Sequence, residues 1–399
     1  MVSRQATDAP DARLSSRATS VERSSIRLMF DLAQESDRDD LVHLEIGEPD
    51  FDTPDHIIAA ASDAATAGKT HYTSNAGLLE LREAIADDMA QDGVTVDPRS
   101  EILVTTGAME ALHLAMLTVV YPGDDVVVPT PLWPNYRTQV KLADATPVEV
   151  PLPPEKGFEL DPDPIIDAMS DETAAVVLTS PSNPTGRVYE RDAVTDVVKA
   201  AVEHDTYVIA DEVYKGLVYG DQPTGIAGYV DASDHVLTVS SCSKTYAMTG
   251  WRLGWLAGPT AIVEAATKLH ESTTACAPSI SQHAAIAALT GPQGDVESMH
   301  EAFRKRRNYV IDRLDEIPGV SCATPEGAFY AFVDVSSLDA SSLEIAKELL
   351  YEWGVVTTPG SGFGSVGEGF LRLSFANGLE RLEVGLDRFE AFVREGGVK

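Results

Sequence analysis

Several strand-like runs of the sequence are each followed by side chains that can take part in acid–base or covalent chemistry. The runs and the groups that follow them are Ala175–Thr179 with Asn183, Tyr207–Ala210 with Asp211 and Tyr214, and Val236–Val239 with Ser241, Ser243 and Lys244. In open α/β sheets, ligands bind beyond the carboxyl ends of the parallel strands. We therefore expect an amide, a carboxylate, a phenol and a lysine amine to lie close together at one edge of a sheet.

This set of groups suits a pyridine aldehyde that carries a phosphate. An amine such as that of Lys244 can form a Schiff base with an aldehyde, and a carboxylate such as Asp211 can keep a pyridine nitrogen protonated, which makes the ring an electron sink. A phosphate can bind the free N–H groups at a helix N-terminus, and the run Glu101–Thr106 leads into such a start at Gly107–Met109. The side chains that can complete this pocket are Ser241, Ser243 and Arg252.

Each of these residues has a simpler interpretation when it is considered alone. Lys244 could be solvated, Asp211 could cap a helix, and Asn183 could lie in an ordinary turn. Trp133 could be a core aromatic, and Arg372 could form a surface salt bridge of small energy. The functional interpretation therefore rests on their joint placement at successive strand ends.

The composition excludes several classes of protein. Of the 399 residues, 44% are hydrophobic and 23% are charged, which is ordinary for a globular protein and not for a fibrous or disordered one. No run approaches the roughly 18 apolar residues of a membrane helix, and the polar start of the chain is unlike a secretory signal. The three cysteines lack CxxC spacing and the nine histidines lack HExxH or HxH spacing. We therefore expect no disulfide framework, no metal site and a cytoplasmic location.

Acidic residues strongly outnumber basic ones. The chain has 63 Asp and Glu against 30 Lys and Arg, which gives a formal charge of −33. Such a surface repels nucleic acid, whose binding proteins need clustered Lys and Arg. Because the acidic residues are spread over the whole chain, we interpret the surface as adapted to high salt, which screens the repulsion. The alternative is an acidic enzyme that works at low salt.

Strand-like and helical patterns alternate through most of the chain. Strands that are joined by helices run parallel, and so their carboxyl ends lie at the same edge of the sheet. The expected strands are Glu101–Thr106, Asp125–Val128, Ala175–Thr179, Tyr207–Ala210 and Val236–Val239, and the expected helices are Ala59–Gly68, Leu78–Asp92, Gly107–Val120 and Arg191–Glu203. This alternation predicts an α/β fold with a mostly parallel central sheet.

The C-terminal third has a different pattern. The expected helices are Val296–Glu316, Leu343–Trp353 and Leu379–Arg394, and the expected strands are Ala328–Val335 and Phe370–Phe375. We interpret this part as a smaller α+β domain that the N-terminal segment completes. The predicted organisation is an arm (residues 1–24), a small domain (25–52 and 291–399) and a large α/β domain (53–290).

Several motifs occur in the order that is typical of one enzyme family. They are Ile46–Pro54, Tyr72–Gly77, Thr106–Ala108, Trp133–Tyr136, Ser180–Gly186, Asp211–Tyr214, Ser241–Lys244, Gly250–Gly254 and Arg372–Phe375. With these motifs the sequence resembles the class I (aspartate, aromatic and alanine-type) aminotransferases, pyridoxal-phosphate enzymes of fold type I, over nearly its whole length. The resemblance implies a three-layer sandwich with a mostly parallel central sheet, a smaller α+β domain and pyridoxal 5'-phosphate as the cofactor.

The resemblance also implies cofactor-binding roles, residue by residue. Lys244 would form the Schiff base and move the substrate proton, and Asp211 would pair with the pyridinium nitrogen. Tyr214 and Asn183 would donate to the ring 3-oxygen, and Trp133 would stack on the ring. The matching phosphate-binding residues are Gly107, Ala108, Met109, Ser241, Ser243 and Arg252, with Tyr72 reaching the phosphate of a neighbouring subunit. That last match implies a homodimer with shared active sites.

The implied reaction is a ping-pong transfer of an amino group between an L-amino acid and a 2-oxo acid such as 2-oxoglutarate. Arg372 would bind the substrate α-carboxylate; the other matching substrate-binding residues are Trp133, Asn183 and the Gly47 backbone. Met109 stands where part of the family has a lysine for a side-chain carboxylate, so a preference for aspartate would need another partner such as Arg17. Neutral or aromatic donors fit equally well.

Two alternatives to amino transfer stay open at this point. One is a different pyridoxal-phosphate reaction on the same scaffold, such as a C–S elimination or a cyclising synthase. The other, more remote, is a non-enzymatic regulator built on an aminotransferase-like domain.

Overall fold

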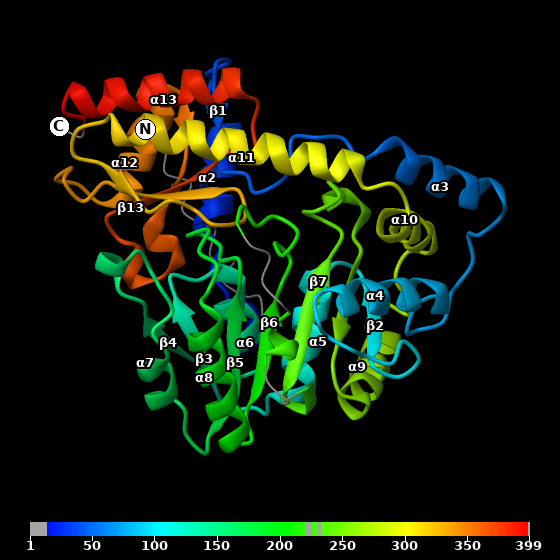
Figure 1. Cartoon of the computed structure of the whole chain (residues 1–399). Helices are drawn as coiled ribbons and strands as arrows, with labels where there is room; N and C mark the ends of the chain where they lie inside the picture. The colour runs from blue at the N-terminus through cyan, green and yellow to red at the C-terminus, as the bar shows by residue number, and fades with distance from the viewer. Residues whose placement is uncertain (1–13, 221–224, 230–232, 398–399) are drawn as a thin grey trace.

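A seven-stranded sheet forms the centre of the larger part of the molecule (Figure 1). The computed structural model describes residues 14–220, 225–229 and 233–397. In spatial order the strands are β2 (Ile102–Thr105), β8 (Gly254–Ala257), β7 (Val236–Ser241), β6 (Tyr207–Asp211), β5 (Thr173–Thr179), β3 (Asp125–Thr130) and β4 (Thr146–Pro151). Of these seven strands, β8 alone runs antiparallel to its neighbours. The prediction of a mostly parallel sheet is therefore confirmed.

Helices cover both faces of this sheet. In β3, Val126 and Val128 pack on the side of α5 (Ala108–Val119), α6 (Pro134–Leu142) and α9 (Thr260–Thr273). Val127 points the other way and packs toward α7 (Pro162–Asp167) and α8 (Arg191–Glu203). Because both faces are buried, the strands are nearly continuous apolar runs rather than alternating ones. The result is the three-layer α/β sandwich that the family resemblance implied.

A third group of helices packs beside the β2 and β8 end of the sheet. The group consists of α3 (Asp55–Thr66), α4 (Leu79–Gln91) and α10 (Ser279–Thr290). Their side chains share a buried cluster with Ile102, Val104 and Trp255 of the two strands. This cluster supports the strand that leads into α5, and so it fixes the start of that helix.

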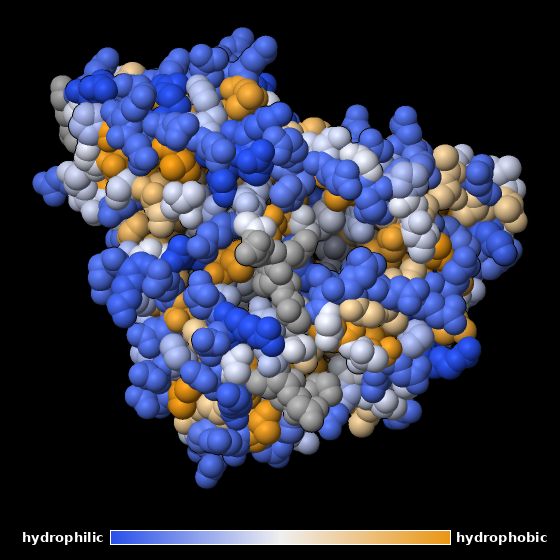
Figure 2. All heavy atoms as spheres, viewed as in Figure 1, coloured by the Kyte–Doolittle hydropathy of each residue, from blue (hydrophilic) through white to orange (hydrophobic). Residues whose placement is uncertain are grey.

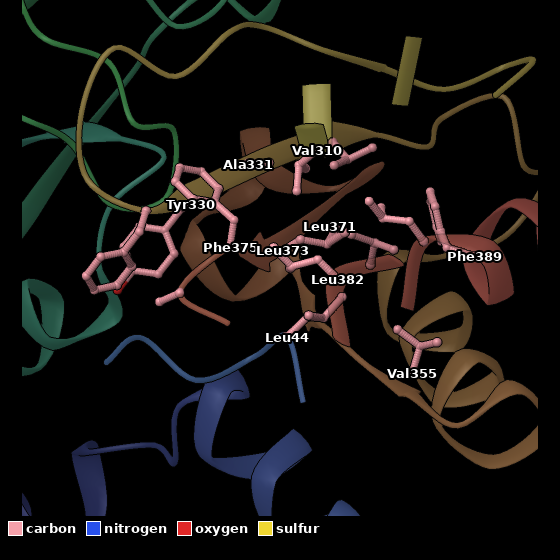
Figure 3. Packing of buried hydrophobic residues seen from close by; sticks show 14 of the residues in the cluster. Leu44, Val310, Tyr330, Ala331, Val355, Leu371, Leu373, Phe375, Leu382 and Phe389 are labelled. Carbon is pink, nitrogen blue, oxygen red and sulfur yellow. The ribbon is translucent and has the colours of Figure 1, made fainter. Parts of the chain in front are cut away.

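The C-terminal part of the chain forms a second, smaller sheet with its own core. In spatial order its strands are β12 (Thr358–Pro359), β13 (Phe370–Ser374), β10 (Tyr330–Asp334) and β9 (Ser321–Cys322). The helices packed with it are α2 (Ser25–Gln34), α11 (Gly294–Asp315), α12 (Ser342–Glu348) and α13 (Leu379–Arg394). Figure 3 shows Leu44, Leu371, Leu373 and Leu382 meeting in this core.

The N-terminal segment joins this second part of the molecule. Strand β1 (Val42–His43) pairs in parallel with β11 (Val355–Val356), more than 300 residues later in the chain. The predicted boundaries at residues 24, 52 and 290 stay a prediction. Of the predicted arm, the structure describes residues 14–24, where α1 (Ser16–Ser20) is a single short helix; residues 1–13 lie outside the described part.

Several elements differ from the sequence prediction. The pattern missed the strands β1, β4, β8, β9, β11 and β12 and the helices α1, α2, α6, α7, α9 and α10. Strand β4 carries Pro147 and Pro151, which are tolerated because it is an edge strand. The predicted helix Leu343–Trp353 divides into α12 and a π-helical turn at Leu349–Trp353. The first predicted helix begins four residues earlier, at Asp55, directly after Pro54.

The surface is dominated by hydrophilic residues on the face shown in Figure 2, where apolar residues occur only in small scattered areas. Within the described ranges, no helix combines the length and apolar character needed to cross a membrane.

Candidate active site

A cavity of about 300 Å³ lies where the carboxyl ends of β5, β6 and β7 face the smaller sheet. The predicted site residues that line it are Gly47, Ala108, Met109, Trp133, Asn183, Asp211, Tyr214, Ser241, Ser243, Lys244, Arg252 and Arg372. The structure thus brings together every predicted site residue except Gly107, which lies directly beside it, and Tyr72.

The amine of Lys244 projects into this cavity from the segment after β7. Its Nζ donates a hydrogen bond to the carbonyl oxygen of Gly47 at 2.6 Å, and the rings of Tyr214 and Phe329 lie 6.0 and 5.8 Å away. The amine is partly open to the cavity but lies deep in the protein. That burial lowers the pKa of Lys244 to about 8, with the cationic Arg372 adding to the effect. An appreciable fraction of the amine is therefore neutral near neutral pH and able to accept a proton.

The carboxylate of Asp211 ends strand β6 and is almost fully buried. It accepts a hydrogen bond from the Tyr136 hydroxyl at 2.7 Å and one from the Val213 backbone N–H at 3.2 Å. Burial raises the pKa of Asp211 to about 6, while these two hydrogen bonds and the Lys244 charge oppose the rise. A cation placed opposite this carboxylate would be stabilised strongly, because the surroundings screen charge poorly.

Arg372 supplies a buried positive charge from the smaller sheet. Only 1% of the residue is exposed. Its Nη1 donates to Asn183 Oδ1 at 3.0 Å, and its Nη2 donates to the backbone carbonyl of Glu45. The guanidinium lies 4.4 Å from the centre of the Tyr330 ring, and its Nε has no hydrogen-bond partner. A planar guanidinium held in this way is suited to bind a carboxylate.

Two phenols and an amide connect these groups. The hydroxyls of Tyr214 and Tyr330 are 2.9 Å apart, and Asn183 Nδ2 lies 3.5 Å from the Tyr214 hydroxyl. Burial raises the pKa of Tyr214 well above its usual value, so that its hydroxyl stays protonated and can donate. A Cβ at Gly47 would lie 2.1 Å from the Tyr330 hydroxyl, so only glycine fits here.

The start of α5 forms a site for an anion. Gly107 has φ +78° and caps the helix, and a Cβ there would lie 2.6 Å from Arg252 Nη2. The absence of that side chain lets the guanidinium approach the helix N-terminus, where the backbone N–H groups and the helix dipole favour negative charge. The hydroxyl residues Ser241 and Ser243 line the same cavity.

An aromatic wall completes the cavity. Trp133 caps the N-terminus of α6 and packs edge to face against Tyr136, with ring centres 5.5 Å apart. The structure adds lining residues that the sequence analysis did not assign, namely Ile26, Tyr136, Val213, Thr249 and Tyr330. Tyr136 stands in a motif that the sequence analysis singled out, and Tyr330 stands in a predicted strand. No local pattern pointed to Ile26.

Two residues proposed for the site lie elsewhere in this chain. Tyr72 is 89% exposed and does not line the cavity. Arg17 pairs with Asp144 on the surface, and so it does not act as a carboxylate partner inside this cavity.

The charges and shape suit a ligand with several features. The α5 end would hold an anionic group, the wall at Trp133 would hold a flat ring, and Asp211 would hold a protonated ring nitrogen. A carboxylate would bind at Arg372, with the Lys244 amine between these points.

Known proteins match the chain along nearly its whole length. The family model for aminotransferase class I and II matches residues 39–389. An aspartate aminotransferase of Pyrococcus abyssi is 40% identical, over 96% of this chain and 98% of its own length. The aromatic-amino-acid aminotransferase 2 of Thermococcus litoralis is 38% identical over the same shares. The solved structure of an aspartate aminotransferase from Thermus thermophilus with maleate is 37% identical, with a TM-score of 0.91, and the match covers 96% of this chain and 100% of that chain.

Proposed function

Because the chain belongs to the class I and II aminotransferases, which transfer amino groups with pyridoxal phosphate, we propose that the cavity around Lys244 is where this transfer takes place. The observation that carries the proposal is that three elements bring their charged groups to one cavity: Asp211 at the end of β6, Lys244 just after β7, and Arg372 in β13 of the smaller sheet.

The residues around the cavity fit the cofactor. The N-terminus of α5 suits a phosphate, because Gly107 has no side chain there and lets the Arg252 guanidinium lie close to the free backbone N–H groups. The buried carboxylate of Asp211 suits a pyridinium nitrogen, and Trp133 offers a flat apolar surface for the ring. Tyr214, with Asn183 beside it, can donate to the ring 3-oxygen.

Pyridoxal phosphate, when bound, holds the migrating amino group and withdraws electrons from the bonds at the substrate Cα. With the cofactor bound, Lys244 Nζ would take the proton from the substrate Cα and would give it back on the other side of the transferred nitrogen. Its lowered pKa, about 8, makes the amine a base that is partly neutral at pH 7 and whose conjugate acid can give the proton back. The Gly47 carbonyl, 2.6 Å away, orients this amine.

Arg372 orients the substrate. Its fixed guanidinium binds the α-carboxylate, which places Cα on the Lys244 side of the cavity. Asn183 holds the guanidinium through its Oδ1 at 3.0 Å. Since the α-carboxylate is common to amino acids and 2-oxo acids, one clamp serves both halves of the reaction.

We infer a ping-pong order with 2-oxoglutarate as the amino acceptor. One cavity and one carboxylate clamp support it, because donor and acceptor must then use the same place in turn. Met109 and Ile26 line the cavity with apolar side chains, which favours neutral or aromatic donors. The relatives include one named for aromatic amino acids, which agrees with this preference, and one named for aspartate, so the donor panel must include both.

A panel of amino donors with 2-oxoglutarate in high KCl tests these proposals. We expect parallel lines in double-reciprocal plots of initial rate against donor concentration at several 2-oxoglutarate concentrations, as a ping-pong order requires. Turnover should depend on the 2-oxo acid, and Lys244→Ala should show none. Lys141→Ala, at a surface lysine, serves as the control. Turnover that proceeds without any 2-oxo acid would instead indicate elimination chemistry, and near-normal transfer by Lys244→Ala would refute the assignment.

We further propose a homodimer, a salt-adapted surface and a cytoplasmic location. The exposed ring of Tyr72 supports the dimer, because contact with a second copy would bury it. The formal charge of −33 supports salt adaptation. The three free cysteines support a reducing compartment. Sedimentation across KCl concentrations tests the dimer, and a monomer with full activity would refute shared active sites.

A further inference from the structure

Behind Asp211 lies a buried pair of hydroxyls to which the proposed reaction gives no role. Tyr136 of α6 is 2% exposed, and its hydroxyl contacts Asp211 Oδ2 at 2.7 Å. The same phenol oxygen lies 2.7 Å from Oγ1 of Thr179, at the end of β5. These are short contacts between groups that three different elements supply, and they form one chain from Thr179 through Tyr136 to Asp211.

The direction of donation along this chain is determined by the chemistry of its ends. An ionised carboxylate can only accept hydrogen bonds, so the Tyr136 hydroxyl must donate to Asp211. The phenol oxygen is then free to accept, and Thr179 is the donor to it. Burial and the nearby Asp211 charge raise the pKa of Tyr136 well above its usual value, so the phenol keeps the proton that it donates.

We propose that Tyr136 and Thr179 are positioning residues that hold Asp211 ionised and aimed at the cofactor ring nitrogen; this rests on the function proposed above for Asp211. Each donated hydrogen bond favours the charged carboxylate over the neutral acid. Thr179 acts only through Tyr136, because a phenol that accepts a hydrogen bond becomes a better donor.

The other groups around Asp211 leave this task to the two hydroxyls. The Val213 N–H occupies Oδ1 at 3.2 Å, and Lys244 favours the ionised form from across the cavity. Glu212 is also buried next to Asp211, and the charge of its carboxylate would oppose that of Asp211. A charge-stabilising donor on Oδ2 is therefore needed, and Tyr136 is the donor found there.

Cofactor binding to the apo-protein provides the test, with pyridoxal phosphate and its 1-deaza analogue, in which a CH group replaces the ring nitrogen. Tyr136→Phe should weaken binding of pyridoxal phosphate about tenfold, the equivalent of one pKa unit, and leave binding of the deaza analogue unchanged. Tyr189→Phe, which also removes a buried phenol hydroxyl, is the matched control and should leave the dissociation constants of both cofactor forms unchanged.

Thr179 is tested by a double-mutant cycle. Thr179→Val should weaken pyridoxal phosphate binding about threefold, a part of the effect of the direct donor, and Thr179→Ser should restore it. In the Tyr136→Phe background, Thr179→Val should have no further effect. Equal weakening of both cofactor forms by Tyr136→Phe, or an additive effect of Thr179→Val, would overturn the proposal.

Asp211→Asn separates this inference from the proposed function. If Asp211→Asn no longer prefers pyridoxal phosphate over the deaza analogue, the role of Asp211 is supported. The binding measurements on Tyr136→Phe then test only the role of the two hydroxyls. Retention of that preference in Asp211→Asn would overturn the role of Asp211 and the inference with it.

Discussion

Replacing Arg372 by lysine should separate carboxylate binding from every other function of the cavity. Lysine keeps the positive charge that helps to lower the pKa of Lys244. It loses the planar fork, however, and after bonds to Asn183 Oδ1 and the Glu45 carbonyl its three N–H groups leave one donor for the two oxygens of a substrate carboxylate. The expected defect is therefore in the recognition of the substrate carboxylate.

The magnitude follows from the hydrogen bonds that lysine cannot make. A hydrogen bond to a charged group is worth about 1.5–3 kcal/mol. Because Arg372 is 1% exposed, water is poorly placed to replace a missing donor. Loss of one of two donors to the carboxylate should then lower kcat/KM about 10- to 100-fold.

The assay compares an L-amino acid with the amine that its decarboxylation gives. Arg372→Lys should lower kcat/KM for the amino acid and leave the slow reaction of the amine unchanged, since the amine has no carboxylate to lose. Arg313→Lys, at a partly buried arginine that pairs with Asp387 and does not line the cavity, is the matched control. An equal loss for both substrates would refute the reasoning, because it would place the defect in Lys244 or in folding.

Three further predictions follow from the same structure. Since the pKa of Lys244 is lowered to about 8, the rate at which apo-protein captures pyridoxal phosphate should rise with pH and level off above about 8. Between that pKa and the ordinary value of 10.5, the unfolded chain binds a proton at this lysine that the folded chain does not bind. The stability of the apo-protein should therefore also rise with pH over this interval. A capture rate that still climbs at pH 10 would contradict this. Gly107→Ala should weaken the binding of pyridoxal phosphate more than that of pyridoxal, because the Cβ of the new alanine displaces Arg252. Gly68→Ala is the control, since Gly68 also has a positive φ (+74°) but open space around it, so that this alanine adds only backbone strain. Equal effects of the two alanines on the binding of pyridoxal phosphate would refute the phosphate site at the start of α5. The unfolding midpoint should rise with KCl as screening relieves the charge of −33, and full stability at very low salt would show that the surface is merely acidic.

Some features of the fold follow from local pattern. The apolar runs now seen as β5, β6 and β7, and the glycine that precedes α5, are visible in the sequence because their periodicity and turn chemistry involve only neighbouring residues. Other elements escaped this reasoning. Strand β8 is four residues long and pairs antiparallel between β2 and β7, an arrangement that no local signal specifies.

The candidate site divides in the same way. The sequence by itself determined the residue types after each strand, and thus the chemistry available to Lys244 and Asp211. Only the tertiary structure decided what surrounds them: Tyr136 donates to Asp211, Thr179 donates to Tyr136, and Arg372 of the other sheet lines the same cavity as Lys244. The physical reason is that residue type and spacing act over a few neighbours, whereas burial, donor direction and pKa depend on contacts between elements distant in the chain.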